Sequence, residues 1–295
     1  VIALRYAATR WSHYLLTDPM PTPSAVHDPV QVAHSRYIEQ ARALRPALAA
    51  AAPAIEAQRR LTPEVMQALI AGRFYRMLQP AFLGGAELPI PYFMETIEEI
   101  AGGDASTAWC LTQCCVCSMA AAYLSREVAT EIFGPPDGII AWGPPAPSEA
   151  RVVDGGYLVT GKWNFASGGH QASWLGGQSY VVERDGSPRR RPDGAPLVRV
   201  MLLPSAQVEI SDAWNVMGLK GTGSDSYAVK DLFVPERHTF ARDEAHERRE
   251  DALLYRFSGS HVYAFGFAAL ALGIARSVLS LLIEVARGKQ PSGSK

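Results

Sequence analysis

The segment that most constrains the fold is residues 154–169, with the sequence DGGYLVTGKWNFASGG. Its first three residues predict a tight turn, because glycine adopts positive φ without steric cost. The strand formers of residues 157–160 follow, and Trp163-Asn164-Phe165 alternates again after a glycine break. We predict a β-hairpin that ends in the small corner 166–169, where the backbone can approach a ligand closely. A plain hairpin with a glycine-rich corner is the alternative interpretation.

Length and charge limit the classes of protein to consider. The chain has 295 residues, 48% of them hydrophobic, which suffices for one large domain or for two to three small ones. The net charge of -1 gives no argument for nucleic-acid binding. A small anion could meet the basic run Arg189–Arg191, but its polar surroundings are typical of a solvated hairpin tip.

All four cysteines lie in one apolar stretch, and helical spacing places Cys110, Cys114 and Cys117 on one face. Ligands on a single helix cannot surround a metal tetrahedrally, so we predict no metal site there. Free cysteine packs as a small hydrophobic residue, which predicts a buried core helix. Their clustering also argues against disulfides and favours a reducing, cytoplasmic compartment.

The hydrophobic periodicity divides the chain into helices, then strands, then a helix. We expect an irregular extension over 1–30, a helical N-terminal domain over 31–134 and a β-domain over 135–245, built as a barrel or a sandwich. The helical pattern that resumes over 246–295 predicts the first helix of a C-terminal helical domain. The expected fold class is therefore a multi-domain α+β protein. The expected helices span 32–70 (two helices), 90–100, 106–124, 125–133 and 251–287.

The longest apolar run, Val262–Ala275, is about 14 residues long and is followed by Arg276. A bilayer needs about 20 residues, so we expect a buried bundle helix and no membrane span. No secretory signal opens the chain.

A second motif segment, residues 214–235, has the sequence WNVMGLKGTGSDSYAVKDLFVP. It combines a glycine-rich turn, a strand-like run around Tyr227 and Val229, and a Phe-Val-Pro exit. The run Gly221–Ser224 is not a phosphate loop, because no helix follows it and Lys220 precedes the glycines.

The two segments together resemble the central β-domain of the acyl-CoA dehydrogenase superfamily. They are most similar to its two-component flavin-dependent monooxygenase branch, with the patterns GGY-x-V-x-G-x-W-x-F-x-SG, W-x-V-x-GL-x-GTGS and FVP. The resemblance extends less sharply over residues 38–295. It implies a helical N-terminal domain, a β-domain and a C-terminal four-helix bundle in a homotetramer. The chain holds only the first bundle helix, so we expect a truncated protein that exposes apolar surface.

The resemblance also implies a flavin site. Phe165, Ala166 and Ser167 would face the isoalloxazine ring, with the Ser167 hydroxyl or amide near flavin N5. Trp142 and Gly143 would lie where the first flavin-contacting strand ends. A serine bonded to its own turn is the alternative role for Ser167.

Two further residues, Trp109 and Gln113, lie four apart on the helix that lines the substrate cavity in the resembled fold. They are candidates for substrate contact, with core packing as the alternative. No general base is assigned, because none of the candidate histidines (His170, His238, His246 and His261) has a convincing catalytic setting.

The function implied is a monooxygenase, or hydroxylase, acting on an aromatic or apolar substrate. It would use O₂ and reduced FMN from a separate flavin reductase, through a C4a-hydroperoxyflavin kept from collapse by a hydrogen bond at N5 in a dry pocket. One alternative is an FAD-dependent acyl-CoA dehydrogenase, although Gly143–Glu149 lacks that branch's Thr-Glu-Pro and Gly-Ser-Asp. Another is a flavin-free, non-catalytic remnant that only assembles with partners.

Overall fold

The computed structural model describes residues 29–242 and 244–289. The extension expected over 1–30 lies outside the described residues except for Pro29 and Val30, which begin the first helix. One compact unit starts at His34 and contains the helices and strands that follow.

The helices of the first half match the predicted ones closely. They are α2 (Pro29–Gln58), α3 (Pro63–Ala71), α4 (Ile90–Ala101), α5 (Ala105–Ser118) and α6 (Arg126–Phe133). Thr62 caps α3 by accepting a hydrogen bond from the Val65 amide, and Pro63 takes the first helical position, where its missing N–H costs nothing. The predicted helix over 106–124 is shorter than expected, because a 3₁₀ turn replaces it from Met119 to Ala122.

Helix α5 is the buried centre of the helical layer. Asp104 caps its N-terminus, and all four cysteines are free and buried, as the sequence predicts. Burial raises the pKa of the Cys117 thiol to about 12, so the thiol stays protonated and packs as an apolar group. In the part of the chain that the structure describes, no cluster of three or more His, Cys, Asp or Glu residues could hold a metal ion.

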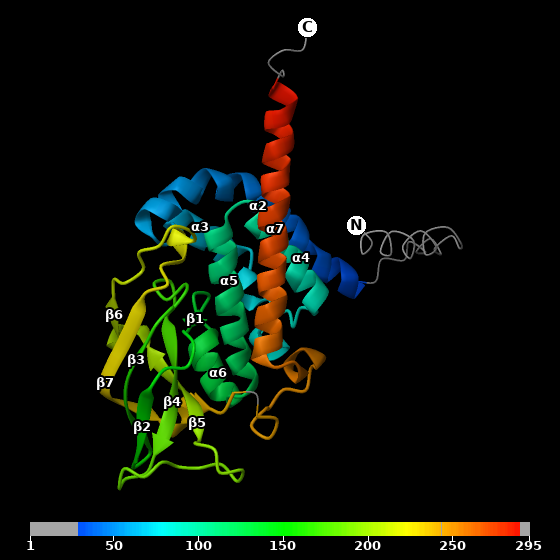
Figure 1. The fold of residues 1–295 in the computed structure, drawn as a ribbon. Helices are drawn as coiled ribbons and strands as arrows, with labels where there is room; N and C mark the ends of the chain where they lie inside the picture. The colour runs from blue at the N-terminus through cyan, green and yellow to red at the C-terminus, as the bar shows by residue number, and fades with distance from the viewer. Residues whose placement is uncertain (1–28, 243, 290–295) are drawn as a thin grey trace, which may run out of the picture. The chain divides into compact units, whose positions relative to one another are not determined.

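The strands form one mixed sheet on one side of α5, which separates it from α7 (Gly259–Gly288; Figure 1). The strand order is β6-β7-β3-β2-β4-β5-β8, and β1 pairs in parallel with β4. The structure thus confirms a β-region with one mixed sheet, and the expected barrel or sandwich is not confirmed. The strands are β1 (Ile140–Ala141), β2 (Ser148–Val153), β3 (Gly156–Trp163), β4 (Trp174–Val182), β5 (Val198–Pro204), β6 (Glu209–Ser211), β7 (Ser226–Pro235) and β8 (Thr239–Phe240).

The predicted hairpin is present as β2 and β3. Val153 pairs with Gly156 across the turn, where Gly155 has φ +78°. Strand β3 ends at Trp163, so the alternation expected to continue to Phe165 is wrong: Phe165 has a left-handed backbone, with φ 64°. Trp163 is fully buried, and a Cβ on Gly177 of β4 would lie 2.5 Å from its ring. Glycine at that position lets the indole lie flat on the sheet.

The glycine-rich corner after β3 sits against α5. The Gly168 amide donates to the Thr222 carbonyl (3.2 Å), and the Ala166 amide donates to the Asp225 carbonyl (3.0 Å). Gly168 has φ +75°, and a Cβ there would lie 2.8 Å from Cys114 Sγ. We expected Gly168 to admit a ligand, but its close approach is to α5.

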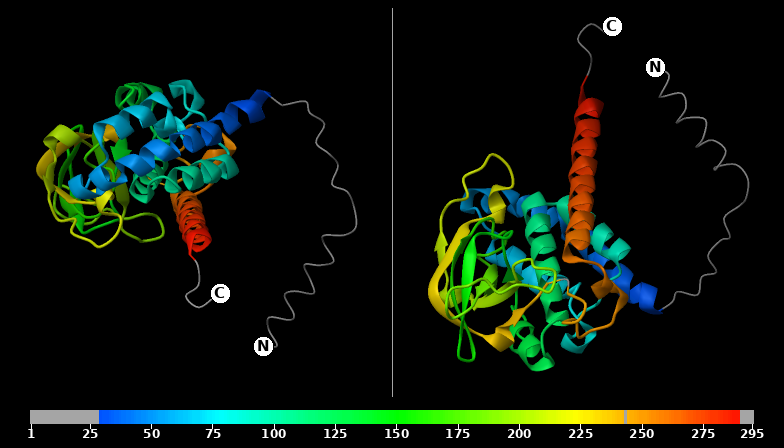
Figure 2. Two further views of the ribbon diagram at one scale, coloured as in Figure 1. Left: turned by 90° about the horizontal axis from the view of Figure 1, so that it is seen from above. Right: turned by 60° about the horizontal axis from the view of Figure 1, so that its bottom comes forward.

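Helix α7 crosses α4 and α5 at two close glycine contacts (Figure 2). A Cβ on Gly266 would lie 2.3 Å from Thr112 of α5, and one on Gly273 would lie 2.4 Å from the Glu98 carbonyl oxygen of α4. Arg276, which follows the apolar run, lies inside the helix, as the helical pattern over 251–287 predicted, and forms ion pairs with Glu98 and Glu99. Gly273 thus allows the backbones of α4 and α7 to approach closely, and the ion pairs of Arg276 add an electrostatic attraction between the same two helices.

Glu99 is a buried carboxylate at the meeting point of three helices. Arg42 (3.0 Å) and Arg45 (3.2 Å) of α2 reach it from one side, and Arg276 of α7 (3.4 Å) reaches it from the other. A buried charge is tolerated only when it is paired, so these contacts couple the position of α7 to α2 and α4.

The C-terminal half of α7 is exposed, as we expected of an apolar helix without neighbours, whereas the run Val262–Ala275, which we predicted to be buried, is only partly buried. Large apolar residues are open to solvent there, including Val278, Leu279, Leu281 and Leu282. By length and composition the helix could cross a membrane, with a mean hydropathy of 2.0 over its most apolar window. Core helices of soluble proteins can be equally long and apolar, and the N-terminal half of α7 packs on α4 and α5.

Replacing Gly273 by alanine tests the α4–α7 crossing. The new Cβ would meet a backbone oxygen that cannot move aside, so we expect Gly273→Ala to lower the free energy of unfolding by about 1–3 kcal/mol in urea titrations. Gly288→Ala is the control, because nothing lies within 4 Å of a Cβ at that position and helix propensity favours alanine. Equal effects at both positions would contradict this packing.

A second pair of variants tests the corner on α5. Gly155 and Gly168 both have positive φ, but nothing lies within 4 Å of a Cβ at Gly155. We expect Gly155→Ala to cost about 1–2 kcal/mol from the backbone alone. Gly168→Ala should cost about 1–3 kcal/mol more, because it also collides with Cys114. Equal unfolding free energies for the two variants would mean that the helix contact is unimportant.

Candidate functional site

A cavity of about 440 Å³ lies where the sheet, α5 and α7 meet. Six of the seven residues that the sequence singled out line it. The seventh, Ala166, does not line it and is buried under the corner, 4% exposed. The six lining residues are Trp109, Gln113, Trp142, Gly143, Phe165 and Ser167.

The walls of this cavity are largely aromatic. Trp109 of α5 stacks on Phe267 of α7, with ring centroids 4.8 Å apart and planes 5° apart. Phe165 stands at the rim with 56% of its surface exposed, edge-on to Trp214 (6.2 Å). An exposed aromatic on a left-handed backbone is costly for stability, and such strain gathers at ligand sites. The cavity is therefore shaped to hold a flat apolar group.

Two glycines shape the wall around Trp142. A Cβ on Gly176 of β4 would lie 2.4 Å from the Trp142 ring, and one on Gly143 would lie 1.8 Å from the Asn164 carbonyl oxygen. Gly143 is thus needed for packing against Asn164. Trp142 Nε1 is buried and has no hydrogen-bond partner among the described residues. An unsatisfied indole N–H is expensive, which fits a wall that a ligand acceptor completes.

Ser167 belongs to a buried series of hydrogen bonds. Its Oγ accepts from Trp109 Nε1 (2.8 Å) and lies 2.7 Å from Ser224 Oγ. Ser224 Oγ lies 2.7 Å from Thr222 Oγ1, which donates to the Leu219 carbonyl (2.9 Å). The motif of residues 214–235 thereby reaches the motif of residues 154–169 through hydroxyl groups.

Asp225, next to that series, holds the loop that carries Trp214. Its carboxylate accepts from the amides of Ala213 (2.7 Å) and Trp214 (2.8 Å) and lies 2.7 Å from His170 Nε2. Burial opposes ionisation, but these hydrogen bonds outweigh it and lower the pKa of Asp225. The resulting stabilisation is present above the unfolded pKa of the carboxyl and is lost as pH falls through the folded value.

No histidine lines the cavity among the described residues. His170 is occupied by Asp225, His238 packs edge-on to Trp174, and His246 lies near Glu244. His261 lies at the exposed start of α7.

Sequence reasoning missed seven lining residues: Pro144, Pro145, Gln178, Arg242, Ser260, Tyr263 and Phe267. Tyr263 and Phe267 are four apart on α7, so helical spacing places these two aromatic residues on one face, which was a usable signal. The Tyr263 hydroxyl lies 3.3 Å from Cys117 Sγ, and burial raises the pKa of Tyr263. Arg242 gave no signal, because only the fold brings it to the cavity.

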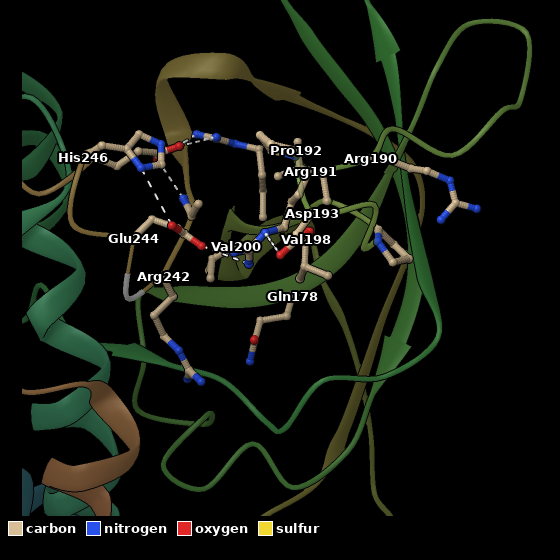
Figure 3. Close-up of a pocket in the computed structure, with 15 residues that line it drawn as sticks. Gln178, Arg190, Arg191, Pro192, Asp193, Val198, Val200, Arg242, Glu244 and His246 are labelled. Carbon is tan, nitrogen blue, oxygen red and sulfur yellow. Dashed lines mark hydrogen bonds and ion pairs between the residues drawn. The ribbon is translucent and has the colours of Figure 1, made fainter.

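A second cavity, of about 680 Å³, lies beside the first, and Gln178 and Arg242 line both (Figure 3). It contains several arginines, but Arg191 pairs with Glu244 (3.0 Å) and Arg199 pairs with Glu247 (2.6 Å). Figure 3 shows Arg190 pointing away from this cluster. Because carboxylates pair with Arg191 and Arg199, this cavity is a weaker candidate for an anion site than its arginine content suggests.

Comparison with known proteins assigns the family. No family model matches the chain. It is 32% identical to indole-3-acetate monooxygenase of Pseudomonas putida over 236 residues, 79% of this chain and 57% of that protein. It therefore spans less than two thirds of that relative.

Solved structures of monooxygenases are also similar to this chain. The crystal structure of the HsaA monooxygenase from M. tuberculosis superposes with a TM-score of 0.76 at 30% identity, covering 85% of this chain and 68% of that one. XiaF from Streptomyces sp., in complex with FADH2 and glycerol, superposes with a TM-score of 0.78 over 90% of this chain and 67% of that one; at 22% identity it supports the fold alone. The chain belongs to the oxygenase components of flavin-dependent monooxygenases, which have the acyl-CoA dehydrogenase-like fold.

Proposed function

We propose that this chain is the oxygenase component of a two-component monooxygenase that hydroxylates an aromatic substrate with O₂. The observation that carries the proposal is the aromatic cavity in which Trp142, Phe165 and Ser167, from the segments that follow β1 and β3, meet Trp109 of α5. The electrons would come from a separate flavin reductase that supplies reduced FMN.

The cavity residues fit a flavin ring on three grounds. The walls are aromatic, so a flat heterocycle can stack there. Trp142 Nε1 lacks a hydrogen-bond partner among the described residues, and a flavin carbonyl is an acceptor. Ser167 adds a hydroxyl at the same wall. FMN is our first choice and FAD the alternative, since a relative of the same fold was crystallised with FADH2.

Reduced flavin, when bound, supplies the two electrons with which O₂ is activated. The chain's own residues would orient the ring and keep water away from it. Ser167 would hydrogen-bond the ring, while Trp109 and Phe267 close the cavity on the α5 and α7 sides. A dry site strengthens that hydrogen bond and slows the wasteful release of hydrogen peroxide.

The substrate class follows from the one charged side chain among the described cavity-lining residues. Arg242 faces a lining that is otherwise aromatic or neutral. Such a site favours an aromatic ring that carries an anionic substituent. The relative from Pseudomonas putida is named for indole-3-acetate, which has this chemistry.

Assembly and location complete the proposal. The exposed apolar half of α7 would be covered in a homo-oligomer, a tetramer in the resembled family. We propose a cytoplasmic location, since four free cysteines suit a reducing compartment.

The function is tested by anaerobic titration with reduced FMN or FAD, followed by mixing with O₂ and aromatic candidates. We expect reduced-flavin binding and hydroxylated product. Ser167→Ala should lower product formed per O₂ consumed by about tenfold, with a matching rise in hydrogen peroxide, because the hydrogen bond between Ser167 and the ring is lost. Ser260→Ala, at another cavity-lining serine, should change this coupling little.

The alternatives give different results. Bleaching of bound FAD by an acyl-CoA would identify a dehydrogenase, and absence of any flavin binding would leave a non-catalytic remnant. Reoxidation at the rate of free flavin, without product, would refute the monooxygenase.

Arg242→Gln tests the substrate class. We expect KM for an anionic arylacetate to rise about tenfold, as loss of one charge-assisted hydrogen bond predicts, while KM for its neutral amide changes little. Arg190→Gln is the control, since Arg190 lines only the second cavity. Equal rises for acid and amide would show that Arg242 does not recognise charge.

A further inference from the structure

The buried hydroxyl series that starts at Trp109 has only one arrangement of hydrogens that makes every bond. The Trp109 indole N–H can only donate, so Ser167 Oγ accepts from it. At the other end, Thr222 Oγ1 donates to the Leu219 carbonyl, which can only accept. Each hydroxyl has one hydrogen, so Thr222 must accept from Ser224. Ser224 must then accept from Ser167.

The direction of the series determines what Ser167 offers to the cavity. Its hydrogen is committed to Ser224, and one of its two lone pairs is taken by Trp109. The remaining lone pair belongs to a side chain that lines the cavity. Ser167 therefore presents an acceptor there.

Burial keeps this direction in place. Ser167, Ser224 and Thr222 are 5%, 5% and 1% exposed, so water cannot readily replace a broken bond. Turning the Ser167 hydrogen into the cavity would leave Ser224 without its donor. In a low-dielectric site such a loss costs more than it does at the surface.

We infer that Thr222 and Ser224 are positioning residues that make the cavity select reduced flavin over oxidised flavin, an inference that rests on the proposed function. Reduced flavin carries a hydrogen on N5, whereas N5 of oxidised flavin is an acceptor. A Ser167 held as an acceptor can bind the first and not the second. The turn Gly221–Ser224, which is not a phosphate loop, thereby acquires a role in ligand selection.

The test separates hydrogen-bond direction from shape. Thr222→Val removes the hydroxyl that holds Ser224, so Ser224 can donate to Ser167 and Ser167 can donate into the cavity. Thr222→Ser keeps the hydroxyl and is the matched control. Dissociation constants for oxidised FMN and dithionite-reduced FMN are measured anaerobically on wild type and both variants, with FAD in parallel.

We expect the ratio of oxidised to reduced dissociation constants to fall by about fivefold to tenfold in Thr222→Val, as the gain or loss of one hydrogen bond predicts. Thr222→Ser should keep the wild-type ratio, and Ser224→Ala should lower it as Thr222→Val does. A tenfold fall is equivalent to a change of about 30 mV in the two-electron potential of the bound flavin. A general loosening of the site would weaken both forms alike and leave the ratio unchanged.

The Trp109 Nε1–H resonance in ¹H–¹⁵N spectra of the flavin-free protein checks the corner itself, with Trp109→Phe for assignment. We expect it to move upfield in Ser167→Ala and to stay near its wild-type position in Thr222→Val, which shows that the variant is folded. If reduced FMN binds and the ratio is the same in wild type and Thr222→Val, this inference alone is overturned. If wild type binds neither form of FMN or FAD, the proposed function fails and this inference fails with it.

Discussion

The contact between the glycine corner 165–169 and helix α5 is the constraint on which the rest of the site depends. Gly168 approaches Cys114 so closely that no side chain fits between them, and its amide is bonded to Thr222. This contact brings Ser167 within reach of the Trp109 indole. A sheet and a helical layer are thereby joined at the point where the cavity forms, so core packing and site geometry depend on the same few atoms.

Helix α7 supplies the last wall through a different kind of contact. Glycines at 266 and 273 let it approach α5 and α4, and the buried Glu99 with its arginine partners sets its position along them. Only after that docking do Tyr263 and Phe267 face the cavity. The C-terminal half of the same helix exposes apolar side chains. The N-terminal half of α7 therefore lines the cavity, while its C-terminal half offers an apolar surface to a partner.

The sequence predicted the hairpin, the helices of the first half and the buried cysteines because each depends on local chemistry. Turn glycines, N-caps and a nearly all-apolar helix leave signals within a few residues. The errors came where tertiary contacts override such signals. Phe165 left the strand pattern because the corner turns onto α5. The domain boundaries at 30, 134 and 245 stay predictions.

By itself the sequence determined the elements, the family resemblance and six residues that line one cavity, since these follow from spacing along the chain and from motifs that recur in relatives. Only the tertiary structure decided that Arg242 and Gln178 join them, that Gly143 and Gly168 serve packing, and that Thr222 and Ser224 orient Ser167. The physical reason is that direction and proximity of hydrogen bonds between segments more than 50 residues apart have no signature in either segment alone.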